Sequence, residues 1–221
     1  MKKKSLVAIA ICFFAMSCSS TKFSDVAESF FGEKLFGLTS EQKYNSKLAS
    51  YKLEAKIITN KGDINVYLYP EVAPETVANF VYLSKKNFYD DMKFSNVSLN
   101  NIIQSGDSKG DTTGTAGYYI KDEETKWLTF DNYGVIAMAQ QQGAKNTASS
   151  QFFITLREKP EFNGKYTAFG NLKSKEDLRV AKTIRQGDII KDVEITGINV
   201  NEFLNNFEEQ IKIWDSKYSG K

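Results

Sequence analysis

The chain has 221 residues, enough for one well-buried core. Its 41% hydrophobic and 25% charged residues exclude a mostly disordered, collagen-like or polytopic membrane protein. The 29 basic and 27 acidic residues nearly cancel, so net charge gives no reason to expect nucleic-acid binding. Histidine is absent, which excludes histidine metal sites and Ser-His-Asp or Cys-His catalysis.

The beginning of the chain predicts export. Residues 1–4 are basic and residues 6–16 form an apolar run. This run is shorter than the roughly 20 apolar residues that a membrane-spanning helix needs, and the order fits a secretory signal. Ser17 and Cys18 follow, and the whole pattern resembles a bacterial lipoprotein signal. We therefore expect residues 1–17 to be a signal peptide.

Cysteine usage supports lipidation at Cys18. The only cysteines are Cys12 and Cys18, so cleavage after residue 17 leaves one cysteine at the start of the mature chain. An unpaired exported cysteine needs an explanation, and a thioether-linked lipid supplies one that would hold the protein on a membrane. The expected location is the bacterial cell envelope, on a periplasmic or outer-surface face. The alternative is an ordinary cleaved signal in which Cys18 is incidental.

Residues 18–52 are predicted to be the lipidated N-terminus and a spacer. Apolar residues recur there at near-helical spacing: Val26, Phe30, Phe31, Leu35, Phe36 and Leu38. They indicate a stalk or a helix packed on the domain. The alternative is a helix that binds a partner or the membrane surface.

From residue 53 the pattern changes to short strands. Residues 53–59 and 64–69 flank the turn at 60–62 and predict a hairpin. Pro74 then opens a helix. Further strands are predicted at residues 93–97, 102–104, 135–139, 151–156, 167–169 and 192–200.

The helices complete the predicted fold. A second helix is expected over residues 174–186, and the tail at 201–221 is helical up to about Trp214. Its apolar face carries Phe203, Leu204, Phe207, Ile211 and Trp214. The fold class is therefore mainly β with flanking helices: a closed antiparallel barrel capped by two helices, with helical extensions at both ends.

The loops offer little chemistry. Residues 106–117 are glycine-rich but lack the context of a phosphate loop, and Asp107 and Asp111 alone are too few for a cation site. We expect a structured surface loop and no metal. Glu123 and Glu124 belong to a charged run at 121–126, which is interpreted as a solvated face.

What remains is a set of apolar and amide residues on neighbouring predicted strands: Gln104, Met138, Ala139, Gln151 and Phe153. These side chains cannot transfer protons at neutral pH. They could bind an extended peptide and grip a proline ring.

Several motifs in order resemble the cyclophilins. Residues 150–155 read Ser-Gln-Phe-Phe-Ile-Thr, as in the family, and residues 104–107, 134–139 and 162–170 resemble further family motifs. The resemblance covers residues 53–200. It implies an eight-stranded barrel with a peptidyl-prolyl cis-trans isomerase site on its outer face. Proline peptides and unfolded exported proteins are the implied partners, without a cofactor.

The resemblance also implies residue roles. The apolar seat for proline would be formed by Phe153, Met138 and Phe162, with Ile102 beside them. Gln104 and Gln151 would bond the peptide, and the backbone of Ala139 and Gln140 would pair with it. The catalytic residues would be Asn96, Gln104 and Tyr166. Tyr166 stands where many members of the family have histidine.

Three positions show a serious departure from the family pattern. Asn96 stands where the family has its catalytic arginine, and Asn101 replaces a pocket phenylalanine. Glu161 also replaces an aromatic residue. Loss of a preorganised charged donor costs about 10²–10³-fold in rate in comparable sites, so we expect an isomerase with reduced turnover. Lys93 or Lys145 could supply a substitute cation for catalysis. The alternative to an isomerase is a catalytically silent module that binds peptides or proteins.

Overall fold

The computed structural model describes residues 39–123, 125, 127–141 and 144–220. The chain divides into two units, Met1–Tyr44 and Asn45–Lys221, and the β-structure belongs to the second. The expected signal segment, Cys18 and the apolar residues up to Leu38 lie outside the described residues. In the part that is described, no helix is long and apolar enough to cross a membrane.

Helix α4 (Ser40–Ser50) is not among the predicted elements. It begins after Thr39, whose Oγ1 accepts a hydrogen bond from the Gln42 backbone N–H at 3.1 Å. The side-chain oxygen of Gln42 accepts one in return from the Thr39 N–H at 2.9 Å. This reciprocal pair is a capping box, a signal that the Thr-x-x-Gln spacing carries. The helix buries Leu48 alone, so its hydrophobic periodicity is weak.

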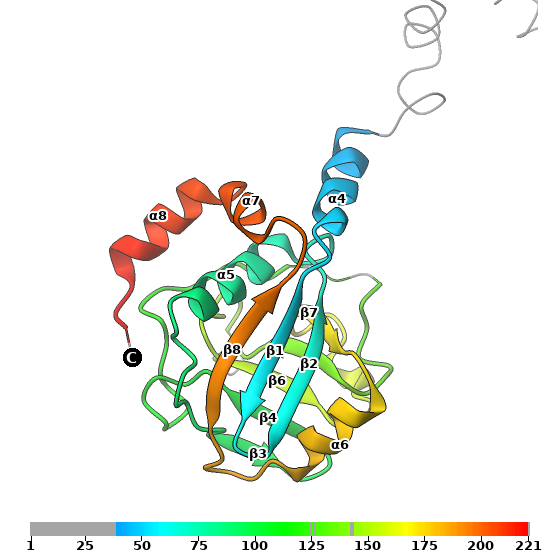
Figure 1. Ribbon diagram of the computed structural model, residues 1–221, viewed down its shortest axis with the longest axis vertical. Coiled ribbons are helices and arrows are strands. Elements are labelled where there is room, and N and C mark those ends of the chain that lie inside the picture. The colour runs from blue at the N-terminus through cyan, green and yellow to red at the C-terminus, as the bar shows by residue number, and fades with distance from the viewer. Residues whose placement is uncertain (1–38, 124, 126, 142–143, 221) are drawn as a thin grey trace, which may run out of the picture. The chain divides into compact units, whose positions relative to one another are not determined.

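Eight strands form one antiparallel sheet in the spatial order β3-β4-β6-β5-β7-β2-β1-β8 (Figure 1). This confirms the mainly β fold with flanking helices, and each predicted strand is present. The last one is shorter than predicted, because it ends at Thr196. The strands are β1 (Glu54–Thr59), β2 (Gly62–Leu68), β3 (Asn96–Ser98), β4 (Ile102–Ser105), β5 (Val135–Met138), β6 (Phe152–Thr155), β7 (Ala168–Leu172) and β8 (Ile190–Thr196).

The two edge strands of this curled sheet are joined at one end. Lys93, just before β3, forms an antiparallel bridge with Ile189, just before β8. The Phe94 N–H donates to the Asp188 carbonyl at 2.8 Å, and the Ile190 N–H donates to the Met92 carbonyl at 2.8 Å. These bonds connect the first and last strands of the spatial order, so the curled sheet approaches a barrel.

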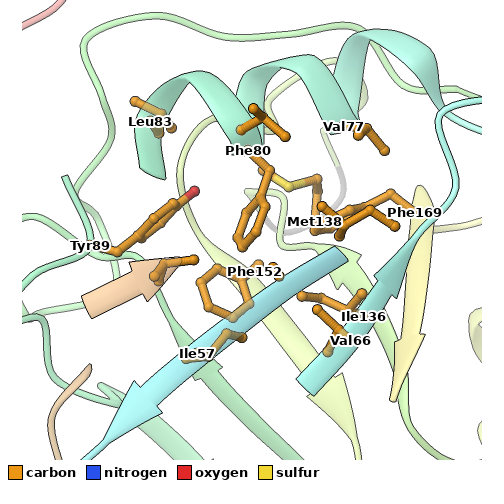
Figure 2. Packing of buried hydrophobic residues seen from close by; sticks show 14 of the residues in the cluster. Ile57, Val66, Val77, Phe80, Leu83, Tyr89, Ile136, Met138, Phe152 and Phe169 are labelled. Atoms are coloured by element: carbon orange, nitrogen blue, oxygen red, sulfur yellow. The ribbon is translucent and has the colours of Figure 1, made fainter. Parts of the chain in front are cut away.

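The main core lies between the sheet and helix α5 (Pro74–Lys85). Figure 2 shows Phe80 reaching from α5 toward Phe152. The Phe80 ring centroid lies 5.4 Å from those of both Phe152 and Phe169 and 5.2 Å from that of Tyr89. Pro74 stands in the first turn of α5, as predicted.

Helix α6 (Lys175–Thr183) is the second predicted helix, and Figure 1 shows it at the opposite end of the strands from α5. Its N-cap is Ser174, whose Oγ accepts from the Asp177 N–H at 3.2 Å. The Asp177 carboxylate accepts hydrogen bonds from the backbone and side-chain N–H groups of Asn65, at 2.7 and 2.8 Å. Asp177 therefore fastens α6 to strand β2.

The tail forms two short helices, α7 (Val200–Asn205) and α8 (Glu208–Lys217), rather than a single one. The backbone leaves the helical conformation at Phe207, where φ is −119° and ψ is 20°. The predicted apolar face is confirmed nevertheless. Phe203 and Trp214 are fully buried in the main core, and the other three residues of that face pack partly buried against it.

Candidate functional site

Three aromatic side chains form an apolar seat that is separate from the main core. They are Phe153 on β6, Phe162 at the end of a 3-10 turn (Pro160–Phe162), and Tyr166. The Phe153 centroid lies 5.7 Å from that of Phe162 and 5.2 Å from that of Tyr166, and the last two are 5.0 Å apart. All three pairs meet edge to face, a favourable aromatic geometry. Phe130 stacks behind Phe153 at 6.2 Å.

Strand alternation decides which predicted residues reach the seat. Ile102 and Ala139 pack partly buried against the seat cluster, on the same side as Phe153. Met138 belongs to the main core and is fully buried, as Figure 2 shows, because neighbouring residues of β5 point to opposite faces. The structure therefore does not bring the Met138 side chain to the seat.

A chain of side-chain amides runs beside the seat. The Asn96 side-chain N–H donates to Gln104 at 3.2 Å, and the Gln104 amide donates to Gln151 at 2.8 Å. The Gln151 amide in turn donates to the backbone carbonyls of Thr112 and Gly114, at 3.0 and 2.8 Å. Asn96 is exposed, and its amide is already bonded to Gln104.

A pocket of about 500 Å³ opens next to this amide chain. Ala139 and Gln140, which the resemblance implies as peptide-pairing residues, lie in its wall. The Gln140 side chain is held by Asp122, to which it donates at 2.7 Å. The remaining lining residues are polar or small: Asn96, Gln104, Thr112, Thr113, Gly114, Thr115, Gln141, Thr147, Ser149 and Gln151.

The glycine-rich loop is built around the buried carboxylate of Asp107. This carboxylate accepts hydrogen bonds from the backbone N–H groups of Lys109, Thr112 and Gly114, at 3.1, 2.6 and 2.8 Å. A Cβ atom at Gly114 would lie 2.3 Å from an Asp107 oxygen, so the close approach requires glycine. In the described part of the chain, no three acidic or thiol side chains gather where they could hold a metal ion.

Glu123 does not belong to a solvated face, contrary to the sequence interpretation. Its carboxylate accepts hydrogen bonds from the backbone N–H groups of Glu75 and Thr76, at 3.1 and 2.8 Å, and from the Thr76 hydroxyl at 2.6 Å. It thereby satisfies the free N–H groups at the start of α5. Burial raises the pKa of Glu123, and these hydrogen bonds oppose that shift. Glu124 lies outside the described residues.

Asn101, at the other end of β4, has two side-chain partners. Its amide donates to the Ser98 hydroxyl at 3.2 Å, and its oxygen accepts from Nε of Arg157 at 3.3 Å. Sequence reasoning missed Arg157, which lies 56 residues from Asn101. Lys93 and Lys145 are exposed, and neither has a hydrogen bond to the amide chain within the described residues.

Lys159 is a second residue that sequence reasoning missed. It is 5% exposed, and its ammonium lies 5.0 Å from the centroid of the Phe162 ring. The same ammonium lies 3.1 Å from the carboxylate of Glu161. Glu161, which stands in place of the family's aromatic residue, therefore forms an ion pair with Lys159. The only sign of this pair in the sequence was the departure from the family pattern at Glu161.

Fold and site together define a class of protein: a curled antiparallel β-sheet, close to a barrel, with an aromatic seat bordered by amide groups. The model of the family described as cyclophilin-type peptidyl-prolyl cis-trans isomerase matches residues 54–201. The chain belongs to this family.

Relatives in the family span most of the same region. A peptidyl-prolyl cis-trans isomerase of Helicobacter pylori is 39% identical over 139 residues, which cover 63% of this chain and 84% of the relative. Peptidyl-prolyl cis-trans isomerase B of Bacillus subtilis is 38% identical, and the match covers 64% of this chain and 96% of that protein. A crystal structure of a Cryptosporidium parvum cyclophilin matches with a TM-score of 0.62 and 34% identity, over 66% of this chain and 99% of its own.

Proposed function

We propose that this protein is a peptidyl-prolyl isomerase of reduced turnover, which acts on Xaa-Pro bonds of exported proteins and is held at a membrane by a lipid on Cys18. The observation that carries the proposal is a contrast within the site. The aromatic seat is intact, whereas the position of the family's arginine holds Asn96, whose amide is bonded to Gln104.

The chemistry explains why this contrast lowers the rate without removing the site. The barrier to rotation of an Xaa-Pro bond is roughly 18–20 kcal/mol and comes from amide resonance. A catalyst must hold the proline ring and favour the twisted amide, since contacts accelerate the reaction only if they are stronger in the transition state. The seat performs the first task. For the second, Asn96 offers a short, uncharged amide in place of a guanidinium fork.

Binding of proline peptides has support from a relative. The Cryptosporidium parvum cyclophilin was also crystallised in the presence of the dipeptide Ala-Pro, and that structure is 33% identical to this chain with a TM-score of 0.61. The seat residues Phe153, Phe162 and Tyr166 provide an apolar surface of the same kind here. The same departure at Asn96 supports the second candidate function, a silent peptide-binding module.

The deciding experiment measures isomerisation by NMR exchange on a short Ala-Pro peptide, using the full-length protein, Asn96→Arg and the uncharged control Asn96→Gln. We expect slow exchange with the natural protein and an increase of about 10²–10³-fold in Asn96→Arg alone, as for restored charged donors in preorganised sites. Turnover of the natural protein equal to that of the Bacillus subtilis relative would contradict reduced activity. Peptide shifts without exchange would support the silent module.

Membrane anchoring is tested separately. The basic start, the apolar run at 6–16 and the position of Cys18 support a lipid-modified N-terminus. Expressed in a bacterium, the full-length protein should fractionate with membranes and carry an added lipid mass at Cys18. Cys18→Ala should lose both. A natural protein that carries no lipid mass would exclude the anchor.

A further inference from the structure

Arg157 and the amide chain lie at opposite ends of the same two strands. β4 and β6 pair with Gln104 opposite Phe153 and Ile102 opposite Thr155. The Leu156 N–H then donates to the Asn101 carbonyl at 2.8 Å, which brings Arg157 to the end of this pair. Gln151 precedes β6, Phe153 lies on this strand, and Arg157 follows in the bend after Thr155, so along the chain Phe153 lies between Gln151 and Arg157. A peptide whose proline occupies the seat thus has the amides on one side and Arg157 on the other.

A hydrogen bond through Nε holds the Arg157 guanidinium in place, while its two terminal nitrogens stay available. Nε donates to Asn101, and the Asn101 amide is itself fixed by its bond to Ser98. The side chain is exposed. Among the described residues, no hydrogen bond engages the two terminal nitrogens, whose N–H groups form a planar fork that matches a carboxylate.

The neighbouring charges leave Arg157 without a close counter-ion. Glu161 contacts the Lys159 ammonium at 3.1 Å. The pKa of Glu161 is lowered first by its own backbone N–H and then by Lys159, with a smaller contribution from Arg157. Glu158 is exposed, and within the described part of the chain neither it nor Glu161 forms an ion pair with Arg157 within 4.0 Å.

We propose that Arg157 is a specificity-determining residue. It makes the site prefer peptides with an acidic side chain one or two residues from the proline, on the side away from the amide chain and its pocket. The inference rests on the proposed binding of proline peptides at the seat, but not on turnover. It also gives Asn101 a role. Asn101, in place of the family's phenylalanine, makes the wall of the pocket less apolar, and its side chain orients the Arg157 guanidinium.

The test measures Kd by NMR titration of the full-length protein with capped peptides. The parent peptide is Ala-Ala-Pro-Ala-Ala, with Glu or Gln placed in turn at each of the four positions around the proline. On one side of the proline only, Glu should bind about two- to fivefold more tightly than Gln, the range of an exposed ion pair. The preference should shrink near 1 M salt, where the screening length is about 3 Å.

Three variants identify the residue responsible. Arg157→Gln should abolish the Glu preference, and Arg157→Glu should replace it by a preference for Lys at the same position. Arg179→Gln, which changes an exposed arginine on α6, should keep it. A Glu preference that survives Arg157→Gln, or equal binding of Glu and Gln at all four positions, would overturn the inference.

Exchange recorded in the same samples separates this inference from the proposed function. A Glu preference without isomerisation would refute turnover and leave the role of Arg157 standing. Isomerisation without any charge preference would refute the role of Arg157 and leave the proposed turnover standing. Failure of all peptides to bind would overturn both.

Discussion

Two adjacent phenylalanines on β6 separate the stability of the barrel from peptide binding. Phe152 packs against Phe80 in the main core, and Phe153 faces Phe162 and Tyr166 in the seat. We expect Phe152→Leu to lower the free energy of unfolding by on the order of 1–3 kcal/mol, with no change in the Kd for a proline peptide. Phe153→Leu should raise that Kd several-fold, because it removes the aromatic ring of the seat against which the proline would pack. Urea unfolding and NMR titration measure the two quantities.

Both side chains are buried, so a loss of stability in both variants is compatible with this assignment. The Kd values for the proline peptide distinguish the two roles. Equal Kd values for the two folded variants would mean that the Phe153 ring is not part of the binding surface.

Single residues of the site were predictable where a strand or a family motif fixes them. Gln104, Gln151 and Phe153 do lie together, because β4 and β6 pair in the register that their apolar patterns favour. Met138 shows the limit of reading a motif without strand alternation, which places Ala137 and Met138 on opposite faces. The contact of Arg157 with Asn101 depends on pairing between distant segments, which one sequence does not reveal.

At the scale of elements, Glu123 joins a loop to the start of α5. Removal of the carboxylate in Glu123→Ala leaves the N–H groups of Glu75 and Thr76 without their acceptor. We expect a loss of about 1–2 kcal/mol in the free energy of unfolding, comparable to the loss of a helix cap. Glu123→Gln keeps one acceptor oxygen and should lose less. Faster hydrogen exchange at the Thr76 amide in Glu123→Ala would localise the effect, and unchanged exchange there would refute it.

Asp177 predicts how the anchoring of α6 depends on pH. Burial opposes its ionisation, but hydrogen bonds from Ser174 and Asn65 outweigh that effect and lower the pKa of Asp177. A folded-state pKa below the unfolded value stabilises the fold above the unfolded pKa of about 3.9, and this stabilisation is lost as the pH falls through the folded pKa. Asp177→Asn should therefore cost on the order of 1 kcal/mol at pH 7.

The same difference between the natural protein and Asp177→Asn should shrink as the pH falls below about 4, because the carboxyl group then becomes neutral. Unfolding curves in urea at a series of pH values measure it. A difference that stays constant down to the acid limit would mean that the charge of Asp177 contributes nothing to stability.

Elements were predictable to the extent that their periodicity is local. The hairpin of β1 and β2 and the helix after Pro74 follow from alternation and from a helix-opening proline. The break between α7 and α8 does not, because the apolar face continues through Phe207, where the backbone nevertheless leaves the helical conformation. Helix α4 was missed for the opposite reason, since it has a capping box but little hydrophobic periodicity.

At the scale of the whole molecule, the tail completes the barrel's core, although the family match ends at residue 201. The Trp214 ring stacks on Tyr118 at 5.6 Å and lies 5.6 Å from Tyr82 of α5. The Tyr82 hydroxyl donates to the Asp215 carboxylate at 2.8 Å. Because these contacts join α8 to α5 and to the loop before β5, the tail and the barrel should unfold as one unit.

Adjacent residues of α8 test this cooperativity. Trp214 is 1% exposed, whereas Ile213 is 47% exposed. Trp214→Ala should lower the free energy of unfolding by about 3–5 kcal/mol, as for large aromatic side chains removed from a core. Ile213→Ala should change it by less than about 0.5 kcal/mol. Nε1 of Trp214 is buried without a hydrogen-bond partner in the described part of the chain, so Trp214→Phe gives up no such bond and should cost less than Trp214→Ala.

Far-UV circular dichroism should report one transition for each variant. In Trp214→Ala and Trp214→Phe, where Trp127 is the remaining tryptophan, its fluorescence should report the same transition. Trp127 contacts Tyr69, which packs against the cluster that contains Phe153, so its fluorescence follows the site side of the barrel. A Trp127 transition that is less stable in Trp214→Ala than in Trp214→Phe would therefore demonstrate that the loss spreads from the tail to the site side of the barrel. If Trp214→Ala left that transition where Trp214→Phe leaves it, the tail would be an independent appendage, and the stability of the peptide site would not depend on it.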